Sequence, residues 1–99
     1  MSTIFSFISQ FGERYLLFIK QETYKEGGIR IQLYDSTDGT PYATATAIIK
    51  EELEPGEVAI KDWSENEGIL DFLVQNKIVK EPHRFVESGH VEIPICELI

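Results

Sequence analysis

The chain has 99 residues, with 9 Lys and Arg against 17 Asp and Glu, which gives a formal net charge of -8. This length accommodates one domain, residues 1–99, and leaves no room for a second independent core. The negative charge disfavours direct binding to nucleic acid or to an anionic membrane surface, because those partners carry the same sign. The hydrophobic fraction of 42% is typical of a folded protein and disfavours intrinsic disorder.

The first fifteen residues, MSTIFSFISQFGERY, lack a basic start, and polar side chains interrupt their apolar positions. We therefore expect neither a signal peptide nor a membrane span. The single cysteine, Cys96, cannot form an internal disulfide, so the composition does not indicate an oxidising compartment. A cytoplasmic protein is the resulting expectation.

The first predicted strand covers residues 14–24, RYLLFIKQETY, which are rich in aromatic and β-branched side chains. It is long for a small domain, so we expect it to bend. Gly27 and Gly28 then predict a tight turn, since glycine adopts positive φ at little cost. The second strand is predicted at residues 29–34, where isoleucine and leucine alternate with polar side chains and Tyr34.

A second turn is predicted at residues 35–39, where Asp38 and Gly39 supply the turn chemistry. The third predicted strand covers residues 42–49. Three consecutive strands joined by two short turns predict an antiparallel meander. A charged loop at residues 50–57 then leads to a short strand predicted at residues 58–61.

One helix is predicted after residue 63. Ser64 with Glu67 three residues later matches a capping box, in which each side chain accepts a backbone N–H at the helix start. Asn76 is expected to end the helix in the left-handed conformation. Apolar side chains at spacings of three and four form a stripe that should lie on the sheet: Ile69, Leu70, Phe72 and Leu73.

Two short strands are expected to finish the chain, at residues 78–80 and 91–95, with a loop at residues 81–90 between them. Together these elements predict an α+β fold. Its mainly antiparallel sheet, a three-stranded meander plus short strands, carries one short helix packed on one face.

Four stretches resemble a family of small uncharacterised bacterial, phage and plasmid proteins, a domain of unknown function: IRIQLYD, GTPYATAT, VAIKDWSENEGILDFLVQNKIV and VEIPICEL. The IKDWSENEG block is the most specific of them. The resemblance covers most of the chain from about Arg30 onward. It implies one compact domain of bacterial or mobile-element origin, and it implies no activity, cofactor or catalytic residue.

Negative charge is concentrated in residues 51–71, which hold eight acidic side chains against Lys61 and so carry a net charge of -7. Residues 1–50 sum to zero and residues 72–99 to -1. A solvated loop followed by a well-capped helix start is the more common explanation of such a run, and the alternative is a surface that meets a basic partner. The candidate binding residues are Glu51, Glu52, Glu54, Asp62, Trp63, Glu65, Asn66 and Glu67.

Trp63, the only tryptophan, precedes the predicted helix cap and has no side chain at Gly68 to pack on. We expect Trp63 to cover Gly68 with part of its ring and to leave the rest in solvent. The exposed part of an aromatic ring could anchor a partner. Glycine inside a helix costs about 1 kcal/mol relative to alanine, so Gly68 suggests the close approach of another backbone or of a ligand. We also expect five carboxylates to share one face: Glu51, Glu52, Glu54, Asp62 and Glu65.

Catalytic and metal-binding signatures are weak. His83, His90 and Cys96 match no zinc spacing, and the sequence holds no phosphate-binding loop and no nucleophile-elbow motif. Cys96 could pair with either histidine as a dyad, but an apolar terminal strand would keep its thiol inert. We expect no cofactor, no metal and no enzymatic activity.

The sequence thus favours a non-enzymatic acidic binding module that presents its acidic patch to a protein partner, and a basic partner would match the charge of the patch. One alternative is a nucleic-acid mimic that inhibits a host DNA-binding or defence protein. The other is a small-ligand pocket protein or an enzyme that uses the same acidic block. Steep salt dependence would favour the mimic, whereas sensitivity to loss of Trp63 would favour an aromatic anchor.

Overall fold

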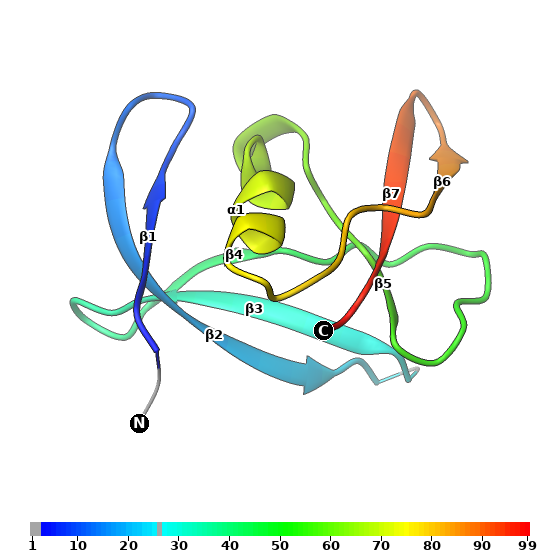
Figure 1. Cartoon of the computed structure of the whole chain (residues 1–99), viewed down its shortest axis with the longest axis horizontal. Coiled ribbons are helices and arrows are strands. Elements are labelled where there is room, and N and C mark those ends of the chain that lie inside the picture. Colours follow the sequence, from blue (N-terminus) through cyan, green and yellow to red (C-terminus); the bar gives the residue numbers. More distant parts are fainter. Residues whose placement is uncertain (1–2, 26) are drawn as a thin grey trace.

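The computed structural model describes residues 3–25 and 27–99. This part of the chain forms two antiparallel sheets and one α-helix (Figure 1). The first sheet has the strand order β1-β2-β3-β4, and the second has the order β5-β7-β6. The α+β class predicted from the sequence is confirmed. The strands are β1 Phe5–Ile8, β2 Arg14–Thr23, β3 Ile29–Asp35, β4 Pro41–Thr44, β5 Glu57–Ala59, β6 Arg84–Ser88 and β7 Val91–Glu97.

The predicted meander is present as β2, β3 and β4, which pair antiparallel in chain order. At the first turn the Tyr24 backbone N–H donates to the Gly28 carbonyl at 3.0 Å. Both Gly27 and Gly28 have positive φ, as expected; Glu26 lies outside the described residues. The third strand is shorter than predicted, because regular pairing stops at Thr44. Further along, Thr46 forms an isolated bridge with Ile60 and so links the two sheets.

Two strands were not predicted. The segment that forms β1 pairs with β2 at the edge of the first sheet, with Phe7 buried beneath it. The loop predicted at residues 81–90 is wrong in its centre, since β6 pairs there with β7. Both strands are short and flanked by polar residues, which weakens the alternating pattern that identifies a strand. The short strand expected at residues 78–80 is reduced to one bridge between Val79 and Leu98.

The helix α1, Ile69–Gln75, begins later than predicted. Ser64 has a φ of 58° and starts a short 3₁₀ turn, Ser64–Asn66, and its side chain makes no capping hydrogen bond. The predicted capping box is therefore wrong. The carboxylate of Asp62 serves the helix start instead, because its Oδ1 accepts the backbone N–H groups of Gly68 at 3.1 Å and Leu70 at 2.9 Å.

Gly68 stands directly before α1 with a φ of 98°, a conformation that a side chain disfavours. A β-carbon at this position would be in ordinary van der Waals contact with the Phe7 ring, at 3.7 Å. The positive φ therefore explains the glycine, without a ligand or the predicted cover by Trp63. At the other end, Asn76 has a φ of -91° and Lys77 has a φ of 59°, so the left-handed residue is Lys77 rather than Asn76.

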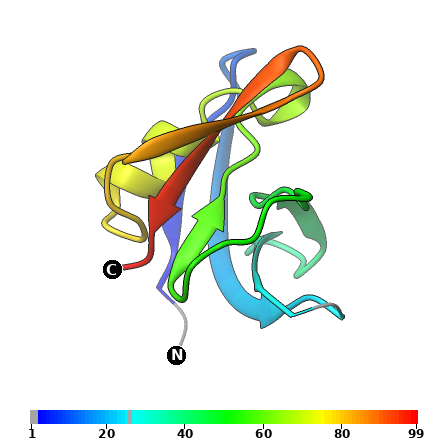
Figure 2. The ribbon, with the colours of Figure 1, turned by 90° about the vertical axis from the view of Figure 1, so that its right-hand side faces the viewer.

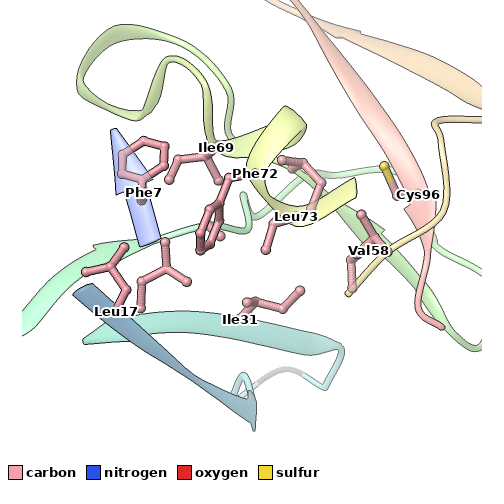
Figure 3. Packing of buried hydrophobic residues seen from close by; sticks show 12 residues of the cluster. Phe7, Leu17, Ile31, Val58, Ile69, Phe72, Leu73 and Cys96 are labelled. Atoms are coloured by element: carbon pink, nitrogen blue, oxygen red, sulfur yellow. The ribbon is translucent and has the colours of Figure 1, made fainter. Parts of the chain in front are cut away.

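The main core lies between the first sheet, α1 and one face of the second sheet (Figure 3). The predicted helix stripe is confirmed, since Ile69, Phe72 and Leu73 are buried and Leu70 packs beside them. The Phe72 ring meets the Phe7 ring edge-on at 5.2 Å between centroids. Within the described residues no helix has the length and apolar character needed to cross a bilayer.

A smaller core cluster covers the opposite face of the second sheet. On β5 and β7, Val58 and its partner Cys96 belong to the main core, whereas Ala59 and its partner Ile95 belong to the smaller cluster. This alternation follows from the pleat of the strands. The side chains that pack over Ala59, Ile93 and Ile95 are Ile49, Leu53, Trp63, Val86 and Val91. The charged residues between β4 and β5 are thereby held against the outside of the second sheet.

Candidate functional site

The candidate residues fall into two separate stretches of the structure. Glu51, Glu52 and Glu54 belong to the acidic loop, residues 50–56, which lies at the right of Figure 1. The other five belong to the pre-helix segment, residues 62–67, which lies at the top beside the start of α1 (Figures 1 and 2). The two stretches are therefore described one at a time.

Most polar side chains of the pre-helix segment form hydrogen bonds within the fold. Asp62 caps α1 as described above, and the Glu65 carboxylate accepts a hydrogen bond from Lys61 Nζ at 2.7 Å. Asn66 is buried, and its Nδ2 donates to the Thr44 carbonyl at 2.8 Å. Glu67 is exposed. Three of these four polar side chains thus hold the segment to β4, to Lys61 or to the helix.

Trp63 is half-buried and packs in the smaller core cluster on the second sheet. It does not cover Gly68, where the neighbouring ring is that of Phe7. The indole therefore covers the apolar face of β5 and β7, with part of its surface left in solvent.

The acidic loop presents carboxylates that differ in their partners. Glu51 Oε2 accepts a hydrogen bond from Arg84 Nη1 at 3.3 Å. Glu52 and Glu54 are exposed, and within residues 3–25 and 27–99 no cationic side chain lies within ion-pair distance of either carboxylate. Leu53 between them points inward to the smaller core cluster. The loop thus holds two unneutralised carboxylates on either side of an apolar anchor.

The structure adds a cluster that was not among the predicted site residues. Glu57, the first residue of β5, has a side chain only 7% exposed. Its carboxylate accepts hydrogen bonds from Arg84 Nη2 at 2.9 Å and from Arg84 Nε at 3.2 Å. His83 Nε2 lies 2.5 Å from the same carboxylate, and the Glu54 backbone N–H donates to it at 2.8 Å. An acidic residue at the head of an apolar strand was the available sequence signal.

These contacts fix the ionisation of Glu57. Hydrogen bonds from Arg84, from the Glu54 backbone and from His83 lower the pKa of the Glu57 carboxyl from 4.5 to about 2. Each of these donors favours the charged form, and together they outweigh the burial that opposes it. The Glu57 backbone N–H also donates to the Glu54 carbonyl, at 3.0 Å. Glu57 therefore holds the end of the acidic loop through both its backbone and its carboxylate.

Two adjoining hollows lie along the acidic loop. The first, about 350 Å³, lies between the β2–β3 turn and residues 47–53, with Ile29, Ile49 and Ala59 in its lining. The second, about 510 Å³, runs along residues 52–57. Gly28, Ile29, Glu52 and Leu53 line both. We call the two together the acidic groove; its lining combines apolar side chains with Glu51, Glu52 and Glu54.

The remaining candidates for chemistry are less favourable. Cys96 is buried, and burial, with a smaller contribution from Glu81, raises the pKa of its thiol to about 11. The neutral thiol is therefore the form present at physiological pH. In the part of the chain that the structure describes, no three His, Cys, Asp or Glu side chains are grouped so that they could hold a metal ion.

Comparison of the chain with protein-family models, with curated proteins and with solved structures finds no significant match. The resemblance suggested by the IKDWSENEG block therefore stays a prediction.

Proposed function

We propose that this protein is a non-enzymatic binding module that holds a positively charged, extended segment of a protein partner in its acidic groove. The observation that carries the proposal is the position of Glu52 and Glu54. Both carboxylates line the groove and lack a cation in the described chain. A partner that brings lysine or arginine side chains would neutralise them.

The composition of the groove suits such side chains. Lysine and arginine combine a charged head with an apolar stem that packs along hydrophobic surface. Ile29 and Leu53 provide apolar surface in the lining of the groove, and Glu52 and Glu54 provide carboxylates. The stem would pack on the apolar side chains, and the cation would meet Glu52 or Glu54.

The groove is also held in a fixed shape before any partner arrives. Arg84 joins Glu51 to Glu57, which ties the acidic loop to the first residue of β6. Leu53 anchors the middle of the loop in the smaller core cluster. The loop therefore loses little conformational entropy when a partner binds, and this favours affinity.

The division of the carboxylates into two stretches favours this groove over the nucleic-acid mimic. A mimic of a phosphate backbone needs a continuous row of negative charges, whereas Asp62 and Glu65 are engaged with the helix start and with Lys61. A bacterial or mobile-element origin of the chain is part of the same proposal, as is a protein partner.

The test is a titration of the protein with a capped oligolysine peptide, followed by NMR chemical shifts. We expect shifts at Gly28, Ile29 and Leu53, and binding that weakens as salt is added. In the double variant Glu52→Gln/Glu54→Gln, binding should weaken about tenfold or more, which corresponds to about 1.4 kcal/mol.

The matched control is the double variant Glu87→Gln/Glu92→Gln. These two exposed carboxylates face each other across β6 and β7, away from the groove, and their removal changes the net charge by the same amount. The control should bind oligolysine as the wild type does. Equal weakening in both double variants would show that net charge alone attracts the peptide, and the groove would be refuted as a site.

A further inference from the structure

The outer edge of β1 has unpaired backbone groups. β1 is the first strand in the order β1-β2-β3-β4, so its far side has no neighbour among the described strands. The Ser9 backbone N–H donates to the Glu13 carbonyl at 2.8 Å, at the end of the β1–β2 ladder. Hydrogen-bonded pairs alternate along an antiparallel ladder, so Phe5 and Phe7 also bond to β2.

It follows that the backbone groups of Ser6 and Ile8 face away from β2. The other side of β2 agrees with this alternation. There the Ser36 backbone N–H donates to the carbonyl of Leu16, the residue that stands opposite Ser6. Because the carbonyl of Leu16 is directed toward β3, the pair formed by Ser6 and Leu16 is not hydrogen-bonded.

This edge has few of the features that normally protect an edge strand. Charged side chains and proline commonly block such edges, but residues 3–12, TIFSFISQFG, contain neither. On the outer face Ile4 and Ile8 are apolar and exposed, and between them the Ser6 hydroxyl accepts a hydrogen bond from Arg14 Nε of β2 at 3.0 Å. Ile4 is 49% exposed, Ile8 is 65% exposed, and Phe11 in the following turn is 80% exposed. Leu16 lies beside them on β2 and is also exposed.

We propose that β1 pairs with β1 of a second copy of this chain, antiparallel, about a two-fold axis at Ser6. In this register Ser6 faces Ser6 of the second copy, Ile4 faces Ile8, and Ile8 faces Ile4. All three pairs bring together the backbone groups that face away from β2. The side chains of Ile4 and Ile8 lie on the same outer face, so the contact is self-complementary, as a two-fold interface requires.

The charge distribution makes β1 the place where a second copy can approach. With a net charge of -8, two copies repel each other over most of their surface. Residues 3–12 carry no charge, and the acidic loop lies at the opposite end of the molecule from β1 (Figure 1). Pairing at β1 therefore joins the uncharged edges and keeps the acidic grooves far apart. The short strand makes this a weak, concentration-dependent dimer.

The test is sedimentation equilibrium over a wide range of protein concentration. The apparent mass of the wild type should rise toward twice the monomer mass as its concentration increases. Added salt should strengthen the dimer by screening the repulsion between copies. Ser6→Pro should stay monomeric, because proline removes an outward N–H that the fold does not use. Ile8→Lys should also stay monomeric, because it places a charge on the edge.

The matched control is Phe85→Lys, which changes the charge equally at an exposed apolar residue on β6, away from β1 and from the acidic groove. It should dimerise as the wild type does. A wild type that stays monomeric at every concentration overturns the proposal. So does a Ser6→Pro variant with an unchanged circular dichroism spectrum that still dimerises.

Hydrogen exchange gives a second readout that needs no variant. Amide protons of Ser6 and Ile8 should exchange more slowly as the protein concentration rises, while those of Phe5 and Phe7 should change little. Rates at Ser6 and Ile8 that are independent of concentration would contradict β1 pairing. The proposal does not depend on the acidic groove, since oligolysine binding and dimerisation are measured separately.

Discussion

The acidic loop and the pre-helix segment contain the same kinds of side chain and use them differently. In the pre-helix segment, Asp62 and Asn66 hydrogen-bond to backbone groups that the fold must satisfy. At the end of the acidic loop, the Glu57 carboxylate pairs with Arg84 and accepts the Glu54 backbone N–H, whereas Glu52 and Glu54 have no cation among the described residues. A run of carboxylates is therefore informative only once those consumed by folding have been set aside.

The largest effect on stability is expected when acid protonates Glu57. The folded-state pKa of about 2 lies below the ordinary value of 4.5. Its stabilisation is thus complete above pH 4.5 and is lost as the pH falls toward about 2. Thermal unfolding at a series of pH values should show this loss in the wild type. Glu57→Gln should be less stable at neutral pH and less sensitive to acid; an unchanged acid sensitivity would contradict the role given to Glu57.

Salt sharpens the same measurement. A hydrogen bond from Lys61 also lowers the pKa of Glu65 to about 2, but the Glu65 side chain is 66% exposed. Solvent and salt screen that pair, with a screening length of about 3 Å at 1 M. In high salt, Glu65→Gln should match the wild type in its acid response, whereas Glu57→Gln should still differ. Equal responses of the two variants would remove the distinction between the two stretches.

The next largest effect is expected at Asn66. Asn66→Ala removes a buried hydrogen bond to the Thr44 carbonyl and should lower the free energy of unfolding by about 1–3 kcal/mol. Glu67→Ala at the next, exposed position should change it by no more than about 0.5 kcal/mol. Urea denaturation of both variants measures the difference. Similar values for the two would mean that Asn66 does not hold the pre-helix segment to β4.

Asp62 should have a smaller effect of a known kind. Asp62→Ala removes the acceptor for two backbone N–H groups at the start of α1 and should cost about 0.5–2 kcal/mol. Asp62→Asn keeps an acceptor oxygen and should retain most of the stability. If Asn is as damaging as Ala, the carboxylate acts through its charge rather than as a helix cap.

The smallest effect on stability is expected in the acidic loop. Glu52→Gln/Glu54→Gln should shift the free energy of unfolding by no more than about 0.5 kcal/mol, since neither side chain is tied to the fold. Denaturation beside the oligolysine titration separates a loss of binding from a loss of structure. A large destabilisation would place these residues with Asp62 instead.

The sequence predicted those elements that rest on strong local patterns. Alternation identified β2 and β3, and spacings of three and four identified the buried stripe of α1. The helix start was mislocated because Ser64 and Glu67 match a capping box, while Asp62 competes for the same backbone groups from outside that motif. A glycine inside the predicted first turn of the helix was the signal against it.

The candidate site was predicted only in part, because partners distant in sequence decide which carboxylates are free. Nothing near Glu57 in the sequence indicates that Arg84 would neutralise it. Arg84 lies on β6, a strand where the sequence predicted a loop. Antiparallel pairing of β5 and β6 with β7 brings the two together. The acidic character of residues 51–71 was visible from composition, and its division between folding and surface was not.

The place of Trp63 has an experimental consequence. As the only tryptophan, it reports on the smaller core cluster alone, whereas Tyr15 and Tyr42 pack against the main core. Fluorescence excited selectively at the indole therefore follows the opening of the second sheet, and tyrosine absorbance follows the first. Coincident transitions would show that the bridge between Thr46 and Ile60 makes both sheets one cooperative unit, and separate transitions would reveal an intermediate in which only one sheet has melted.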